Sequence, residues 1–345
     1  MSSSTKSESK GKETKNDPKD GMPNMSSETK NNNKGAVPKS SLTTDKFTTV
    51  TEAKQRILSP VKTGLKVLIM NASGPNQGEG TATRRKQAIQ SVIKRHNPDL
   101  VLFQEFSWKG LHGKTWSTDP VPEHFQLTLN NDASILYNIN ESTVEEKPIR
   151  ELQRILQELQ RPTSKHPTPI PLDFAPIPRM SLRVVKTKGV PVMEFICISW
   201  HGKHAGMSND TKVTEFTYLM IFLNEIYVKY HLPILIAGDF NVEVKLICLE
   251  VKDPFKLYDY KASERRKKKG VIDYFIATKE LHLSDMEPVD LKKDSKADKP
   301  EEVLDHDPII AMLEPAPLSD TVPGWNKSAS RKQNEMTHNF FIHIF

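Results

Sequence analysis

Six short apolar runs of this 345-residue sequence end beside an Asn, a Glu, a His or an Asp. Apolar runs bounded by turn or charged residues, such as 65–70 and 234–237, are typical of buried strands. In an open sheet, side chains at strand ends face a common crevice, so these positions predict one shared site. The six positions are, in chain order, Asn71, Gln104-Glu105, His201, Gly238-Asp239-Phe240-Asn241, Asp273 and Asp305-His306-Asp307-Pro308.

The remaining pattern predicts a mixed α/β protein with about eight strands and three helices. Apolar residues at helical spacing predict helices over 84–96, 149–159 and 216–230. A segment with six prolines between Pro162 and Pro178 predicts an extended surface excursion. The other predicted strands are 99–103, 133–137, 181–187, 192–200, 271–277 and 308–313.

Composition divides the chain into three parts. Residues 1–45 have no aromatic side chain and only six apolar residues, too few to offset the entropy of ordering, so we expect a disordered N-terminal tail. Residues 46–315 form the expected folded domain, and residues 316–345 form the expected C-terminal tail.

Several classes of protein are disfavoured by the sequence. No apolar stretch approaches the roughly 18–20 residues of a membrane-spanning helix, and the N-terminus lacks the apolar core of a secretory signal. We therefore expect an intracellular protein, cytoplasmic or nuclear, without a membrane span. Cys197 and Cys248 are the only cysteines, which argues against a disulfide framework or a cysteine zinc site. The formal charge of +6 is compatible with a polyanionic substrate without requiring one.

Each polar position has an ordinary structural interpretation by itself, as a helix cap, a turn or a packed histidine. Together they supply what metal-assisted phosphate chemistry needs: oxygen ligands, a group that activates water, and donors to phosphoryl oxygens. We assign Asn71, Glu105 and Asp305 to one principal metal ion. Asp239 holds the attacking water, and Asn241 donates to the phosphate. His201 and His306 donate to the phosphate or move a proton, and Asp273 orients His306.

This ordered set resembles the endonuclease/exonuclease/phosphatase superfamily, the fold of deoxyribonuclease I, over residues 64–315. The resemblance implies a four-layer α/β/β/α sandwich of two packed mixed sheets and a phosphodiesterase or phosphatase that depends on Mg²⁺ or Mn²⁺. Two departures are visible. Leu304 occupies a position that is commonly Ser in the family, and His201 stands where abasic-site endonucleases usually have Asn, which disfavours an abasic-site repair role.

The sequence says less about the substrate. Trp108, Lys109 and Lys203 follow strand ends and suit nucleic acid, although solvated loops explain them equally well. Arg265 and Arg266 belong to the basic run 264–269, which is a phosphate-backbone contact, a nuclear address or an exposed loop. We favour an endonuclease. A phosphatase, a sphingomyelinase-like lipid phosphodiesterase with 339–345 as its only apolar anchor, and a catalytically silent binding module remain the alternatives, and the oligomeric state stays open.

Overall fold

The computed structural model describes residues 64–72, 79–106, 124–128, 132–162, 164, 168–189, 192–203, 206–263, 270–292 and 304–317. The tail predicted at 1–45 lies outside these residues. The tail predicted at 316–345 lies outside them except for its first two positions. Both tails therefore stay predictions, and nearly all described residues belong to the domain expected from 46 to 315.

The described residues form two six-stranded mixed sheets. The first sheet has the order β11 (Leu281–Pro288), β12 (Ile309–Pro315), β1 (Leu65–Asn71), β2 (Leu100–Gln104), β4 (Ala133–Asn138) and β3 (Phe125–Thr128). The second has the order β5 (Ser142–Glu146), β6 (Met180–Thr187), β7 (Glu194–His201), β8 (Ile234–Asp239), β10 (Asp273–Thr278) and β9 (Phe255–Tyr258). The parallel pairs are β1 with β2 and β7 with β8, each in the middle of its sheet.

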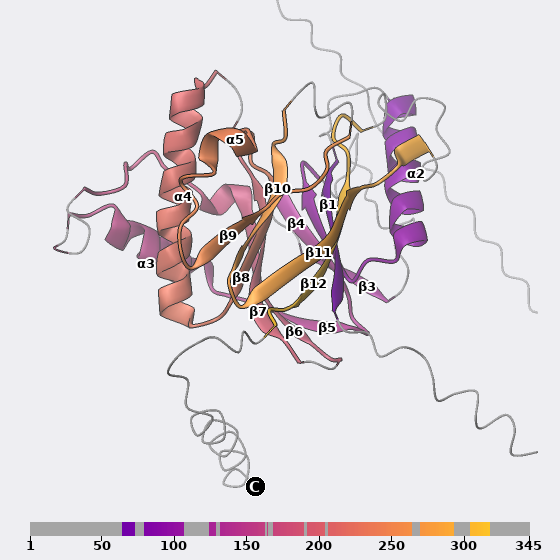
Figure 1. Cartoon of the computed structure of the whole chain (residues 1–345), viewed down its shortest axis with the longest axis horizontal. Helices are drawn as coiled ribbons and strands as arrows, with labels where there is room; N and C mark the ends of the chain where they lie inside the picture. The colour runs from indigo at the N-terminus through magenta and orange to yellow at the C-terminus, as the bar shows by residue number, and fades with distance from the viewer. Residues whose placement is uncertain are drawn as a thin grey trace, which may run out of the picture. The chain divides into compact units, whose positions relative to one another are not determined.

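Three apolar clusters separate four layers (Figure 1). One cluster lies between α2 (Glu79–His96) and the first sheet, and a second lies between the two sheets. The third lies between the second sheet and the helices α3 (Ile149–Leu159) and α4 (Asn209–Tyr230). The short α5 (Val244–Ile247) and the 3₁₀ turn η3 (Ile177–Arg179) complete the described elements. The arrangement is the predicted four-layer sandwich.

The longest helix begins earlier than its apolar pattern indicates. The pattern predicted α4 from residue 216, but the helix begins at Asn209 because Ser208 caps it, accepting a hydrogen bond from the backbone of Thr211. Its buried residues include Phe216, Leu219 and Leu223, which pack on the second sheet. The cap places the first turns of α4 beside the end of β7.

The predicted number of strands is wrong, because the described residues contain twelve. The four missed strands are β3, β5, β9 and β11, and all four form sheet edges. β5 buries only Ser142 of its five residues, and β11 is interrupted by a register shift around Asp285. Edge strands with exposed polar residues lack the apolar run that identifies a buried strand.

The prediction of a surface excursion between 162 and 178 is wrong for its second half. Ile170 and Phe174 are 3% and 5% exposed and belong to the core against α3 and α4. The backbone N–H of Ile170 donates to the carbonyl of Leu159, which ties the segment to the end of α3. The prolines argued against an α-helix in this segment, but they did not predict whether its side chains are buried.

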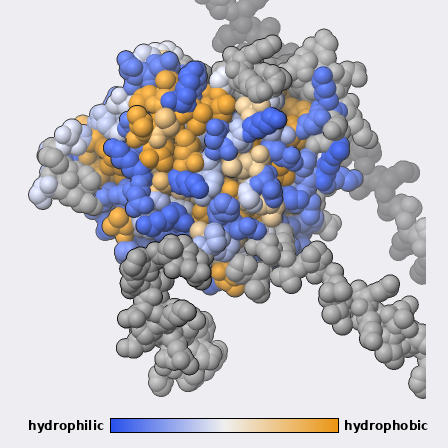
Figure 2. All heavy atoms as spheres, viewed as in Figure 1, coloured by the Kyte–Doolittle hydropathy of each residue, from blue (hydrophilic) through white to orange (hydrophobic). Residues whose placement is uncertain are grey.

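One face of the domain carries exposed apolar side chains. Figure 2 shows hydrophobic residues around α5 and the adjoining part of α4, among mostly hydrophilic neighbours. Leu249, directly after α5, is 82% exposed. Among the helices that the structure describes, none has both the length and the apolar character needed to cross a bilayer.

Candidate active site

The six polar strand ends converge at one edge of the sandwich, where both sheets contribute. In the first sheet, Asn71 is paired in register with Gln104, and Glu105 follows directly. In the second sheet, Asp239 is paired with both His201 and Asp273. His306 reaches the same place from the segment before β12. The strand order alone therefore brings together residues up to 235 positions apart, Asn71 and His306.

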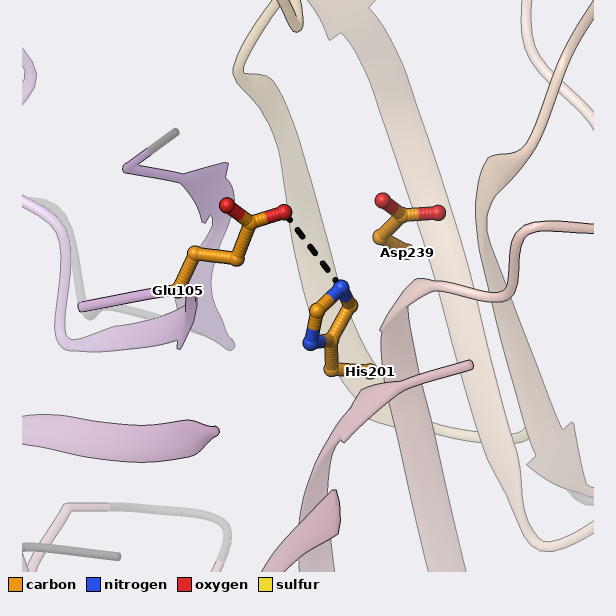
Figure 3. Close-up of side chains that lie close together, drawn as sticks. All are labelled: Glu105, His201 and Asp239. Carbon is orange, nitrogen blue, oxygen red and sulfur yellow. Dashed lines mark ion pairs between the residues drawn. The ribbon is translucent and has the colours of Figure 1, made fainter. Parts of the chain in front are cut away.

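Glu105, His201 and Asp239 form the first group (Figure 3). Glu105 Oε1 lies 3.4 Å from His201 Nε2. The side-chain amide of Asn71 donates to Glu105 Oε1 at 3.2 Å and to Asp239 Oδ2 at 3.1 Å. Asn71 therefore connects a carboxylate of the first sheet with a carboxylate of the second.

Asp239, Asp273 and His306 form the second group. His306 Nδ1 lies 2.9 Å from both carboxylate oxygens of Asp273. The other ring nitrogen, Nε2, lies 3.6 Å from Asp239 Oδ2. The imidazole therefore bridges two carboxylates, with its Nδ1 side fixed by Asp273 and its Nε2 side directed at Asp239.

The environment moves the pKa values of two carboxyl groups in opposite directions. The hydrogen bond from His201 lowers the pKa of Glu105 to about 2, with Asn71 adding to the effect against the opposing influence of burial. Burial raises the pKa of Asp239 to about 6, and the charge of Asp273 adds to the increase against the opposing charges of His306 and His201. The pKa of Glu105 is therefore held far below neutrality, whereas the pKa of Asp239 is raised towards it.

The donor set suits a divalent cation. In each group the ligand atoms lie within 4.8 Å of one another, and Asp239 belongs to both groups. Carboxylate oxygens are the ligands that hard divalent cations prefer. Glu105, with its low pKa, and the buried Asp239 therefore fit a metal position between the two sheets.

Asp305 lies apart from these groups. Its side chain is exposed, and it belongs to neither group formed by the described residues. The charges of Asp305 and Glu105 both act on Arg85, a 3% exposed residue of α2 whose pKa is lowered by burial. Arg85 was not predicted, although its position three and four residues before Ala88 and Ile89 places it on the buried helix face. Leu304 is fully buried in the cluster beneath α2.

A polar contact joins the two sheets beneath the site. The amide of Gln104 donates to Ser199 Oγ at 3.0 Å, and Ser199 Oγ donates to the carbonyl of Phe103 at 2.8 Å. Gly238 has a φ of +147°, and a Cβ there would lie 2.1 Å from the carbonyl oxygen of Trp200 and 2.8 Å from Gln104 Nε2. Glycine is therefore required at Gly238 by both backbone conformation and space.

Asn241 lies in a tight turn after β8 with a φ of +54°. Its backbone N–H donates to Asp239 Oδ1 at 2.8 Å, and its side-chain amide donates to the carbonyl of Gly202 at 2.9 Å. The turn fixes the Asp239 carboxylate from the opposite side to Asn71. The side-chain amide of Asn241, which was predicted to donate to a phosphate, is therefore already oriented by the carbonyl of Gly202, directly after β7.

Of the predicted substrate-binding residues, only Lys203 is described. Its Nζ lies 2.7 Å from Glu215 Oε1 of α4, so the charge is paired. Trp108, Lys109, Arg265 and Arg266 lie outside the described residues. The residues on either side of the basic run, Ser263 and Gly270, are described.

Comparisons with known proteins identify the fold. No protein-family model matches the chain, and no curated protein matches its sequence. The catalytic domain of human Nocturnin, solved with a bound sulfate anion, superimposes with a TM-score of 0.52 at 14% identity, covering 75% of this chain and 96% of its own. An endonuclease/exonuclease/phosphatase family protein from Bacteroides thetaiotaomicron gives a TM-score of 0.51 at 17% identity, covering 73% and 98%. The chain therefore has the deoxyribonuclease I-like fold of the endonuclease/exonuclease/phosphatase superfamily, as its polar strand ends predicted.

Proposed function

We propose that this chain is a divalent-metal-dependent phosphoesterase and, within that class, an endonuclease. The observation that carries the proposal is the environment of Asp239. This buried carboxylate lies within hydrogen-bond or ion-pair distance of Asn71, the Asn241 backbone and His306. A buried carboxylate held on both of its oxygens by these groups is suited to orient a water at one fixed position.

The geometry gives each residue a distinct role. Glu105 and Asp239 would hold the cation, and a cation there would lower the pKa of a bound water and polarise the phosphoryl oxygen. Asp239 orients the attacking water. His306, fixed by Asp273 on its other nitrogen, donates to the phosphoryl oxygen or moves a proton. His201 and Asn241 supply further donors, and Asp305 is retained as an outer partner on the metal side.

Nucleic acid is favoured by where the basic run 264–269 begins and ends. Ser263 Oγ, directly before the run, donates to Asp307 Oδ2, next to His306. Directly after the run, the carbonyls of Val271 and Ile272 accept from the backbones of Val244 and Phe240. Both ends are thus held beside the catalytic groups. We therefore assign Arg265 and Arg266 to a phosphate backbone leading away from the site, with Lys203, Trp108 and Lys109 as further contacts.

The first test is a substrate panel. Purified full-length protein, with Mg²⁺ or Mn²⁺, is incubated with plasmid DNA, RNA, an inositol phosphate and sphingomyelin vesicles, and each reaction is repeated with excess EDTA. We expect nicking of DNA or cleavage of RNA that stops with the chelator. Hydrolysis of only the inositol phosphate or sphingomyelin would replace the endonuclease with one of the alternatives. No hydrolysis of any substrate would favour a binding module.

The second test measures binding without cleavage. A metal-free Asp239→Asn variant binds a DNA or RNA oligonucleotide, and log affinity is plotted against log salt concentration. Replacing Arg265, Arg266 and residues 267–269 with Ser should flatten the slope by roughly one unit per lost phosphate contact, because fewer counterions are released. The control replaces Lys186 and Lys188, at the opposite end of β6 from the site, and should leave the slope unchanged. An unchanged slope in the first variant would remove the basic run from the substrate contacts.

A further inference from the structure

Arg179, directly before β6, contacts the end of β7 through two hydrogen bonds. We propose that Arg179 is a positioning residue for this site, fixing His201 and Asn241 through the backbone carbonyls to which it donates. The inference rests on the proposed function, because it assigns Arg179 a part in the same reaction. It is carried by hydrogen bonds that converge on one peptide segment.

The guanidinium group of Arg179 spans two successive carbonyls. Its Nε donates to the carbonyl of His201 at 2.7 Å, and Nη2 donates to the carbonyl of Gly202 at 2.7 Å. Both distances are short for N–H···O bonds and are typical of charge-assisted ones. A planar group with two parallel donors fixes the orientation of both peptide units, which a single donor cannot do.

The same peptide segment carries the contacts of the catalytic turn. The carbonyl of Gly202 accepts from Asn241 Nδ2 at 2.9 Å, and the Gly202 N–H donates to the carbonyl of Asp239 at 2.7 Å. A Cβ at Gly202 would lie 2.1 Å from the carbonyl oxygen of Phe240. The end of β7 and the turn after β8 are therefore in direct contact, and Arg179 holds them from the β6 side.

Arg179 is itself rigidly placed. It is the last residue of η3, where its N–H donates to the carbonyl of Pro176. The next residue, Met180, begins β6 and is paired in register with Trp200. Arg179 is half-buried and forms no ion pair with another residue of the described chain. Its donors are thus directed at the two carbonyls and are not shared with a carboxylate of the described chain.

A purely structural arginine would affect stability and leave the reaction unchanged. A positioning role instead predicts that displaced His201 and Asn241 lower kcat, since misplacement of about 1 Å can cost on the order of a hundredfold. Lysine keeps the positive charge but cannot donate two parallel N–H bonds to neighbouring carbonyls, so it should restore only part of the rate.

The kinetic test compares Arg179→Gln and Arg179→Lys with the wild type on whichever phosphodiester substrate is cleaved. We expect kcat to fall at least about tenfold in Arg179→Gln, less in Arg179→Lys, with KM changed little. Arg183→Lys is the matched control, because Arg183 lies on β6, which directly follows Arg179 in the chain, but pairs with Glu146 away from the site. It should lose stability while kcat is kept. Equal kcat in all variants, or a loss confined to KM, would overturn the proposal.

A second measurement does not depend on activity. In ¹⁵N-labelled full-length protein, hydrogen exchange of the Asn241 side-chain amide reports its bond to Gly202. We expect exchange to accelerate at least about tenfold in Arg179→Gln and to stay unchanged in Arg183→Lys. If no phosphoester is cleaved, the proposed function fails, and this measurement still decides the role of Arg179. Unaltered exchange in Arg179→Gln, in a variant that remains folded, would overturn that role.

Discussion

Replacing Gly238 with Ala tests whether the close approach of strands beneath the site is required. An alanine Cβ would lie 2.1 Å from the carbonyl oxygen of Trp200, in a residue with a φ of +147°. The backbone conformation costs about 1–3 kcal/mol for a residue other than glycine, and overpacking costs about 1–3 kcal/mol more. The sum, about 2–6 kcal/mol, corresponds to a Tm lower by roughly 5–20 °C for a domain of this size.

Alanine variants of three other glycines separate the cost of the backbone conformation from the cost of the close contact. Gly206 has a φ of +71° and open space around its Cβ position, so Ala there tests the backbone conformation alone. Gly202 has a close contact at 2.1 Å without a positive φ, so Ala there tests the lack of space. Gly189 has neither, and its Ala variant should melt with the wild type. The assay is thermal unfolding followed by circular dichroism at fixed pH with chelator.

The expected order of Tm is Gly189→Ala highest, Gly206→Ala next, and Gly238→Ala lowest, with Gly202→Ala also well below the wild type. A Gly238→Ala protein that melts within about 2 °C of the wild type, or no lower than Gly206→Ala, would refute the reasoning, since about 1 kcal/mol moves Tm by at least that much. In that case the strands have enough freedom to separate around a methyl group.

The remaining predictions concern the catalytic residues and the tail. Asp239→Asn and His306→Ala should each lower turnover by about a hundredfold or more, because both groups act in the transition state; unchanged turnover in a folded variant would remove that residue from the mechanism. The folded pKa of Asp239, about 6, lies above its ordinary value of 3.8, so wild-type stability in chelator should fall as pH rises from about 4 to about 6. The Asp239→Asn variant should lack this loss, and parallel urea-unfolding curves for the two proteins across that range would contradict the raised pKa. Deletion of residues 1–45 should change Tm little, since the segment has few apolar residues to bury; a large drop would show that it docks on the domain.

The strands that carry the site were predictable because they are buried on both faces. β1, β2, β8 and β10 expose almost nothing, so they are continuous apolar runs, and their polar ends stand out. β3 and β5 are half-exposed edge strands and have no such contrast. Ile170 and Phe174 lie in a proline-rich segment whose burial depends on α3 and α4, which local pattern does not reveal.

The candidate site, like the fold, was only partly predictable from the sequence. Residue types and their order at strand ends indicated Asn71, Glu105, His201, Asp239 and Asp273. They also indicated that Asp273 orients His306, but not that Asn71 donates to both Glu105 and Asp239. Arg179 was not predicted, because an arginine before a strand is ordinary, and its importance depends on which carbonyls lie opposite. The side chain of Asn241 was expected to face a phosphate, whereas the carbonyl of Gly202 already accepts from it. Contacts between segments far apart in sequence decide these details.

The site is divided between two sheets that are joined face to face by an apolar layer. Glu105 belongs to the first sheet and Asp239 to the second, so the distance between these carboxylates depends on how the sheets slide and tilt on each other. Side chains of that layer, such as Ile69, Cys197 and Phe275, set this alignment without touching the site. Substitutions there that conserve volume can therefore adjust the distance between Glu105 and Asp239 in small steps, without replacing any polar residue of the candidate site.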